Sequence, residues 1–189
     1  MAGRLVYVMG PSGSGKDTVL QGLQSRLDGC HLACRIITRP VEAFEAHATS
    51  VSADEFNRLE ARGDLAMAWR ANGLAYGIPD GIDAVLDGGR DVLMNGSRAY
   101  LPQARARYAN LLAVMLTVDP YILRQRLRTR GRENEAEIDA RMERNNQFAA
   151  ATVDGRTSAD GVFVIDNSGN VEQTIQSLTI FLQQARLCA

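Results

Sequence analysis

The sequence is poor in several residue types, and each shortage argues against a class of protein. No stretch approaches the about 20 consecutive apolar residues that a membrane-spanning helix needs. The first residues have neither the apolar length nor the cleavage site of a signal peptide. The chain holds only three cysteines, so we expect reduced thiols rather than a disulfide framework. These features predict a cytoplasmic protein without membrane contact.

An excess of charge of one sign is also missing. Lysine and arginine total 21 against 22 for aspartate and glutamate, which gives a formal net charge of -1. A chain without a basic field does not attract nucleic acid, so any anion site must be local. Cys30, His31 and Cys34 lack a fourth ligand and match no zinc spacing. The sequence therefore predicts neither a nucleic-acid partner nor a structural zinc.

Apolar runs and helical patterns alternate along the 189 residues, 46% of which are hydrophobic. Near-continuous apolar runs are typical of parallel strands that are buried on both faces. They lie at 5–9, 91–94, 111–118 and 162–165, with a weaker one at 35–38. Helices are expected at 16–27, 120–130, 135–150 and 171–185, and Ser52 to Glu55 reads as a capping box that opens a short one. We predict a single α/β domain over residues 1–189 with a parallel five-stranded sheet flanked by helices.

Residues 10–17, GPSGSGKD, match the phosphate-binding loop pattern G-x-x-x-x-G-K-[ST] except at the last place. The loop lies between an apolar run and a helical pattern, as such loops do. Its backbone N–H groups, the helix dipole and a lysine together hold a triphosphate. We therefore expect a nucleoside triphosphate to be bound by Gly10, Pro11, Ser12, Gly13, Ser14, Gly15, Lys16, Asp17 and Thr18.

Asp17 stands where other loops of this kind have a hydroxyl that ligates Mg²⁺. A carboxylate is also a hard oxygen ligand, so Asp17 can hold the metal directly or through water. The run 91–94 leads into Asn95 rather than an acidic residue, which would leave room for this charge. Two alternatives stay open: Thr18 supplies the hydroxyl, or Asp17 only stabilises the positive end of the helix. Mg²⁺ is the expected cofactor, with Asp17 as its candidate ligand.

Four further segments give the chain a resemblance to the guanylate kinase family. They are ITRP at 37–40, SADEF at 52–56, WRANGLAYGIP at 69–79 and RLRTRGRE at 126–133. The resemblance implies a phosphate-loop kinase core, a small acceptor-binding lobe at about 35–90 and an arginine-rich lid at about 126–140. It implies that Arg39 and Tyr76 bind the acceptor's phosphate. The catalytic cations it implies are Lys16, Arg126, Arg130, Arg132 and Arg141.

The chain departs from that family's pattern at the residues that recognise the guanine base and at a second arginine expected after Arg39. Guanylate kinases read guanine with a Glu and an Asp, where this chain has Ala68 and Ser97. The second arginine expected shortly after Arg39 is absent, with Val41 and Glu42 in its region. A site built to hydrogen-bond a base discriminates through such groups, so we do not expect a guanylate kinase.

A closer resemblance is to the ribose 1,5-bisphosphate phosphokinase family, through MGPSGSGKD, ANGLAYG, VLMNGSRAYLPQARARY and LRQRLRTRGREN. Asp17 belongs to that pattern. The resemblance implies transfer of the γ-phosphoryl of ATP to ribose 1,5-bisphosphate, which yields 5-phosphoribosyl 1-diphosphate in phosphonate breakdown. The partners would be ATP and a phosphorylated sugar; monomer and homodimer both stay open. The alternatives are a nucleoside monophosphate kinase of altered specificity and a non-catalytic binding module.

Several residues have both a functional and a structural interpretation. Asn95, Ser97 and Arg98 follow an apolar run, where α/β sheets bind ligands, or they form a simple turn. The arginines at 124–132 are lid cations or a solvated helix face; Gly131 would end that helix and free Arg132. Trp69 is expected to pack. Residues 167–170 would lie next to adenine or cap a helix.

Overall fold

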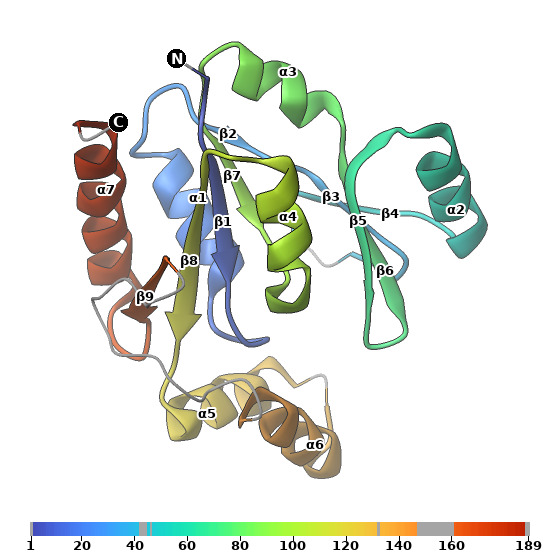
Figure 1. Cartoon of the computed structure of the whole chain (residues 1–189). Coiled ribbons are helices and arrows are strands. Elements are labelled where there is room, and N and C mark those ends of the chain that lie inside the picture. The colour runs from blue at the N-terminus through green and yellow to red at the C-terminus, as the bar shows by residue number, and fades with distance from the viewer. Residues whose placement is uncertain (1, 42–44, 46, 132, 147–160, 188–189) are drawn as a thin grey trace. The chain divides into compact units, whose positions relative to one another are not determined.

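The computed structural model describes residues 2–41, 45, 47–131, 133–146 and 161–187, and Figure 1 labels its elements. The chain folds as two compact units. One comprises Met1–Tyr7 and Leu27–Leu112, and the other Val8–Arg26 and Ala113–Ala189. Within the described ranges, no helix has the length and apolarity to cross a membrane. The single kinase domain with the stated lobe and lid boundaries stays a prediction.

A five-stranded parallel sheet has the order β2-β7-β1-β8-β9, which confirms the predicted fold class. Its strands are β2 (His31–Leu32), β7 (Val92–Asn95), β1 (Leu5–Met9), β8 (Leu111–Thr117) and β9 (Val162–Asp166). The four strong apolar runs of the sequence all became strands of this sheet, and every residue of β1 is buried. The fifth strand, β2, was not predicted because two residues are too few to form a hydrophobic pattern.

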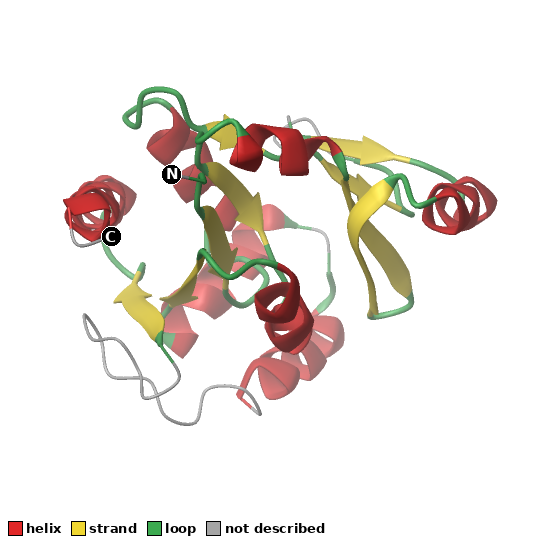
Figure 2. Cartoon of the chain, turned by 45° about the horizontal axis from the view of Figure 1, so that its top comes forward, coloured by secondary structure: helices red, strands yellow, loops and turns green. Residues whose placement is uncertain are grey.

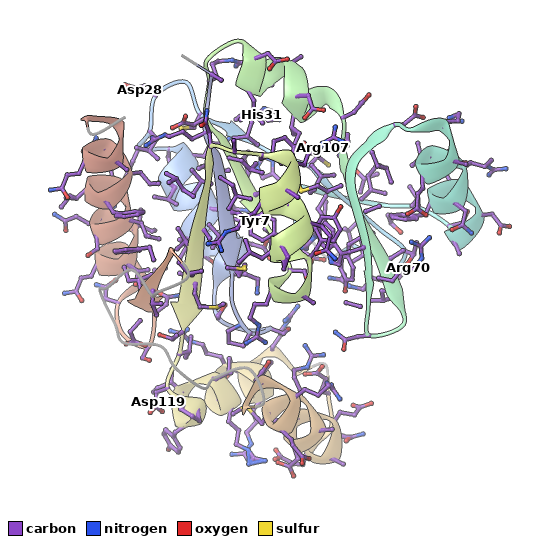
Figure 3. The ribbon with its side chains drawn as sticks, in the orientation of Figure 1. Tyr7, Asp28, His31, Arg70, Arg107 and Asp119 are labelled. Carbon is purple, nitrogen blue, oxygen red and sulfur yellow. The ribbon has the colours of Figure 1, made fainter. Side chains whose placement is uncertain are left out.

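Helices of the unit that contains the glycine-rich loop begin where the sequence predicts. They are α1 (Lys16–Gln24), α5 (Pro120–Arg130), α6 (Glu135–Asn146) and α7 (Val171–Leu187). The Asp119 carboxylate caps α5 by accepting from the N–H groups of Tyr121 and Ile122 (Figure 3). Gly131, with φ of 67°, ends α5 as expected. The end predicted for residues 147–150 lies outside the described residues.

Helix α7 packs against α1 through a glycine. A Cβ on Gly22 would lie 2.3 Å from Cδ1 of Ile175, so the absence of a side chain lets the two helices approach. Helix α1 ends at Gln24, earlier than the predicted Leu27. The buried residues Leu123, Leu127 and Ile138 form a separate small core that joins α5 to α6.

A four-stranded sheet with the order β4-β3-β6-β5 belongs to the other unit. Its strands are β4 (Ala48–Ser50), β3 (Arg35–Ile37), β6 (Leu74–Pro79) and β5 (Leu65–Ala71). Helix α2 (Ala53–Arg62) packs against β5 and β6 (Figure 2), and the predicted cap at Ser52 is confirmed by a 3.1 Å bond from the N–H of Glu55. Helix α3 (Gly81–Asp87), a 3-10 turn (Arg98–Tyr100) and helix α4 (Leu101–Arg107) also belong to this unit.

The expectation that residues 35–38 form a strand of the parallel sheet was wrong. Strand β3 instead lies in the four-stranded sheet, where it pairs in parallel with β4 and in the antiparallel sense with β6, with Ile37 opposite Tyr76. The cause is the β5–β6 hairpin, whose turn residues Asn72 and Gly73 adopt φ of 51° and 74°. This hairpin offers β3 an edge to pair with. The pairing depends on residues far away in the sequence, so the short apolar run at 35–38 does not predict it.

Candidate functional site

The glycine-rich loop between β1 and α1 depends on three glycines. Gly10, Gly13 and Gly15 adopt φ of 154°, 88° and 86°, in the region that disfavours side chains. A Cβ on Gly10 would lie 2.7 Å from the carbonyl oxygen of Leu116. The loop closes on itself where the N–H of Ser14 donates to the carbonyl of Pro11 at 3.1 Å. The loop conformation therefore requires glycine at these three positions, and at Gly10 a side chain would also clash with Leu116.

Lys16 folds back over this loop. Its Nζ donates to the carbonyl oxygens of Gly10 and Pro11, both at 2.9 Å. Gly15, the residue that precedes α1, supplies no side-chain cap to the first N–H groups of the helix. A lysine ammonium and the N-terminus of α1 thus lie at one loop, and both favour a bound anion.

Asn167, after β9, supports the loop through a hydrogen bond to its backbone. Its buried Nδ2 donates to the carbonyl of Ser14 at 2.7 Å, and its own N–H donates to Thr117 at 2.8 Å. In the same turn the Asn170 side chain accepts from the N–H of Glu172, which confirms the helix-cap interpretation for this residue. The nearby adenine site stays a prediction.

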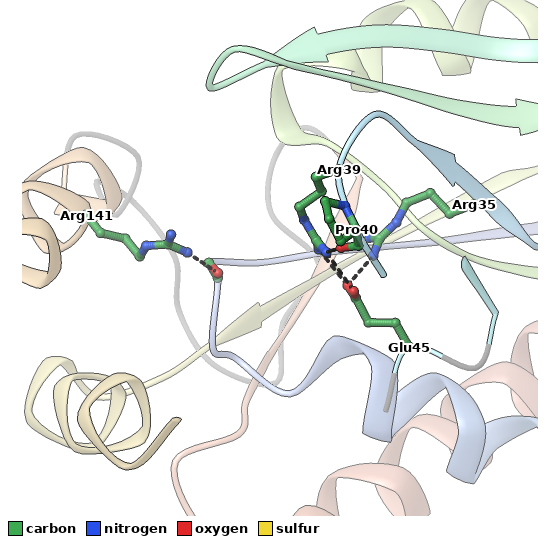
Figure 4. Close-up of polar contacts among 6 residues, drawn as sticks. Arg35, Arg39, Pro40, Glu45 and Arg141 are labelled. Carbon is green, nitrogen blue, oxygen red and sulfur yellow. Dashed lines mark hydrogen bonds and ion pairs between the residues drawn. The ribbon is translucent and has the colours of Figure 1, made fainter. Parts of the chain in front are cut away.

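Arg141, from α6, lies against the loop. Its Nη1 donates to Oγ of Ser12 at 2.5 Å (Figure 4), and its Nη2 pairs with Glu133. Arg126, from α5, reaches the carbonyl of Ser168 at 3.5 Å. Arg130 is half-buried at the end of α5, whereas Arg132 lies outside the described residues. Of the predicted lid cations, the structure therefore brings Arg141 to the phosphate loop.

Two other arginines of α5 bind carboxylates of α6 instead. Nε of Arg128 lies 2.7 Å from Glu135, and Arg124 pairs with Asp139 and with Glu135. The Arg128 guanidinium lowers the pKa of the Glu135 carboxyl. The arginine run is thus divided: Arg124 and Arg128 hold α5 to α6, a role that neither the lid nor the solvated-face interpretation predicted.

Asp17 occupies the first turn of α1 and is half-buried, whereas Thr18 is exposed. Among the residues that the structure describes, no group of three or more His, Cys, Asp or Glu side chains could hold a metal. A single carboxylate fits magnesium, which is commonly held by one or two carboxylates together with phosphates and water. The buried Oγ of Ser14 has no hydrogen-bond partner in the described part of the chain. The donor set suits a metal that arrives with a nucleotide.

In the other unit, Arg35, Arg39 and Glu45 form a cluster (Figure 4). The two nitrogens of Arg39 lie 2.8 and 2.7 Å from the two Glu45 oxygens, and Nη2 of Arg35 lies 3.1 Å from one of them. The Glu45 side chain is only 3% exposed. Arg39 was expected from the sequence as an anion ligand, but Arg35 and Glu45 were not. A buried carboxylate that holds two arginines in a fixed orientation is a second place suited to an anion.

Tyr76 belongs to a row of aromatic rings in the same unit. Its ring is stacked on Trp69 with centroids 5.6 Å apart and planes 9° apart, and Trp69 also lies 5.6 Å from Tyr100. The guanidinium of Arg35 lies over the Tyr76 ring at 5.9 Å. The packing role expected for Trp69 is confirmed, and the row fixes the Tyr76 side chain.

Tyr7, from β1, fixes the segment after β7. Its side chain is buried (Figure 3), and its hydroxyl donates to the carbonyl of Ser97 and accepts from the N–H of Ser97, both at 2.9 Å. A Cβ on Gly96 would lie 2.2 Å from the Tyr7 ring, so this place requires glycine. Burial raises the pKa of Tyr7, so its hydroxyl keeps its proton. Sequence reasoning missed Tyr7 because it reads as part of an apolar strand; its single hydroxyl in that strand was the available signal.

Comparisons with known proteins agree with this geometry. The model of a family described as AAA domain matches residues 6–148. A protein of Pseudomonas paraeruginosa named ribose 1,5-bisphosphate phosphokinase PhnN is 51% identical over 191 residues, with 100% of both chains covered. A protein of Azotobacter vinelandii with the same name is 48% identical, again with 100% of both chains covered.

Solved structures show a similar fold. A guanylate kinase from Anaplasma phagocytophilum matches with a TM-score of 0.69 and 16% identity, covering 97% of this chain and 86% of that one. A gluconokinase from Sinorhizobium meliloti matches with a TM-score of 0.54 and 18% identity, covering 97% and 93%. At such low identity the likeness concerns the fold alone.

Proposed function

Because the chain belongs to the AAA domain family and to the family of ribose 1,5-bisphosphate phosphokinases, we propose that it phosphorylates ribose 1,5-bisphosphate with ATP. The product would be 5-phosphoribosyl 1-diphosphate (PRPP), formed in phosphonate catabolism and in PRPP and NAD biosynthesis. The observation that carries the proposal is the 51% identity over the full length of a relative with that name. Ala68 and Ser97, in place of base-reading carboxylates, support a sugar rather than a nucleotide as acceptor.

Catalysis of this transfer requires alignment of the two substrates and positive charge near the phosphates, but no general base. An oxygen of the acceptor's 1-phosphate forms a bond to the γ-phosphorus, and the bond from that phosphorus to the β,γ-bridging oxygen breaks, so that ADP leaves. The attacking phosphate is already largely deprotonated near neutral pH, because its second pKa is about 6. The two histidines of the chain are therefore not needed as proton acceptors.

Each cation of the nucleotide site has a proposed role. Lys16, released from the Gly10 and Pro11 carbonyls by the incoming phosphates, would hold the β- and γ-phosphates together with the loop N–H groups. Arg141, already at Ser12, would neutralise charge on the transferring group, with Arg126, Arg130 and Arg132. Arg39, Tyr76, Asn95, Ser97 and Arg98 would bind the acceptor.

Asp17 is our candidate ligand for Mg²⁺, directly or through water. When bound, the metal neutralises charge on the β- and γ-phosphates. The half-buried position of Asp17 in the first turn of α1 supports this assignment, and the exposure of Thr18 makes that hydroxyl the less favourable donor. The charge of Asp17 also balances part of the positive potential of the loop.

A coupled assay of ADP formation tests the function. We expect turnover of ribose 1,5-bisphosphate with a kcat/KM at least about 100-fold above that for GMP, since discrimination by unpaired polar groups reaches this size and more. Phosphoribosyl diphosphate should be identified as the product, and Lys16→Ala should abolish most of the turnover. Efficient use of GMP without any use of the sugar bisphosphate would refute the proposal.

A further inference from the structure

One carboxylate oxygen holds two guanidinium groups beside each other. Oε1 of Glu45 accepts from Nη2 of Arg39 at 2.7 Å and from Nη2 of Arg35 at 3.1 Å, while Oε2 accepts from Nη1 of Arg39 at 2.8 Å (Figure 4). Two guanidinium groups and one carboxylate leave this cluster with a formal charge of +1. A protein that holds them together therefore has a place where a further anion is favoured.

The four-stranded sheet explains why Arg35 points to this place. Along β3, Arg35 and Ile37 lie on the same face because side chains alternate. Ile37 is opposite Tyr76, and Tyr76 is opposite Trp69, so the aromatic row shares that face. Arg35 then lies over the Tyr76 ring at 5.9 Å, which orients its guanidinium plane.

Arg35 still has capacity to donate hydrogen bonds. A guanidinium has five N–H donors, four of them on its two Nη atoms, and Nη2 of Arg35 donates to Glu45. Its Nε is buried, so the Nη atoms are the ones that can donate to a ligand. The Arg35 side chain is 12% exposed and that of Arg39 27%, so the pair is partly screened from water but still reachable. Charge-assisted bonds to phosphate are strong in such a place, and the forked guanidinium matches phosphate oxygens.

We propose that Arg35 is a second anion-binding residue of the acceptor site, which binds the same phosphate of the acceptor as Arg39 does. Glu45 is a positioning residue, since it holds both guanidinium groups. The second arginine that is absent after Arg39 is thus supplied from four residues before it. The assignment rests on the proposed function for the identity of the acceptor, but not for the anion site itself.

Steady-state kinetics of Arg35→Ala and Arg35→Lys test the proposal. We expect Arg35→Ala to raise the KM for ribose 1,5-bisphosphate at least about tenfold, as the loss of one charge-assisted bond predicts, with the KM for ATP almost unchanged. Arg35→Lys keeps the charge but not the forked guanidinium, so its KM for ribose 1,5-bisphosphate should lie between those of the wild type and Arg35→Ala. Arg70→Ala is the matched control, because Arg70 lies on β5 of the same sheet, is 55% exposed and pairs with Glu60.

A purely structural role for Arg35 predicts a different result. Removing one partner of a buried ion pair then lowers the urea midpoint and the fraction of active enzyme, while both KM values stay at the wild-type level. That outcome in the folded Arg35→Lys variant overturns the proposal. If Arg35→Ala does not fold, Arg35→Lys alone decides.

A binding measurement separates this inference from the proposed function. Inorganic phosphate is titrated by calorimetry into protein whose loop is filled with a non-hydrolysable ATP analogue. We expect the Kd for phosphate to rise in both Arg35 variants and to stay constant in Arg70→Ala. If the wild type does not use ribose 1,5-bisphosphate but the Arg35 variants bind inorganic phosphate more weakly than the wild type, only the proposed function fails. If the wild type is active and phosphate binding is unchanged in the variants, the role of Arg35 fails.

Discussion

Tyr7 shows how a single hydroxyl in a buried strand can position a segment far away in the sequence. It satisfies both backbone groups of Ser97, and its ring fills the space that Gly96 leaves. Asn95 and Arg98 are close to this anchor in the sequence, and burial lowers the pKa of the Arg98 guanidinium. Tyr7 therefore holds the backbone of Ser97, one of the proposed acceptor ligands.

Tyr7→Phe should separate the hydroxyl from the ring. The variant keeps the ring against Gly96 but leaves the N–H and carbonyl of Ser97 without this partner, which costs about 1–3 kcal/mol of unfolding free energy. We expect the KM for the acceptor to rise and the KM for ATP to stay the same. Urea unfolding and steady-state kinetics measure both effects.

Tyr108→Phe is the control for this change. The Tyr108 hydroxyl donates to Asp83 at 2.7 Å in the same unit, at the end of α4 rather than after β7. Tyr108→Phe should lower the free energy of unfolding without altering the KM for the acceptor. A similar rise of KM in both variants would show that general destabilisation, and not the Ser97 anchor, is responsible.

At the scale of elements, helices α5 and α6 use their arginines in two ways. Arg124 and Arg128 hold the helices to each other, over the small core of Leu123, Leu127 and Ile138. Arg141 faces the loop from α6. Helical spacing alone places arginines on faces, but the neighbour that each face meets decides their role.

Arg141→Ala and Arg128→Ala should therefore differ in their effect on catalysis. Loss of a group that stabilises transition-state charge lowers kcat by about 100- to 1,000-fold, which we expect for Arg141→Ala. Exposed ion pairs contribute little, so Arg128→Ala should leave kcat within about twofold. Single-turnover rates and kcat measure this contrast. Equal losses in the two variants would contradict the division of the arginine run.

At the scale of the whole molecule, ligand binding adds to the free energy of unfolding. A ligand at 100 times its Kd stabilises the native state by about 2.7 kcal/mol. For a chain of this size, each kcal/mol of added stability raises Tm by about 2–4 °C. Thermal unfolding therefore reports nucleotide and metal binding without any turnover.

We expect ATP to raise the Tm of the wild type, and Mg²⁺ to add a further rise because Asp17 helps to hold it. In Asp17→Asn the shift with ATP alone should be equal or larger, because a negative charge near the phosphates is gone. The additional shift with Mg²⁺ should be smaller. Identical Mg²⁺ increments in the two proteins would mean that Thr18 or water completes the metal shell, with Asp17 as a helix-terminal charge only.

The local part of this protein followed from sequence alone. Strand β1, the glycine-rich loop and α1 are consecutive, and their signals are a buried apolar run, residues with special φ values and an amphipathic helix. The caps at Ser52 and Asp119 and the stop at Gly131 are equally local. Such features depend on a few neighbouring residues, so one sequence is enough to predict them.

Tertiary structure decided which distant residues meet. Tyr7 and Ser97 are 90 residues apart, and Asn167 and Ser14 are 153 apart. Strand β3 joined the mixed four-stranded sheet because the β5–β6 hairpin offered it an edge, and that pairing brought Arg35 to Tyr76. The free energy of these contacts depends on burial and hydrogen bonding between elements, so no local pattern in the sequence records them.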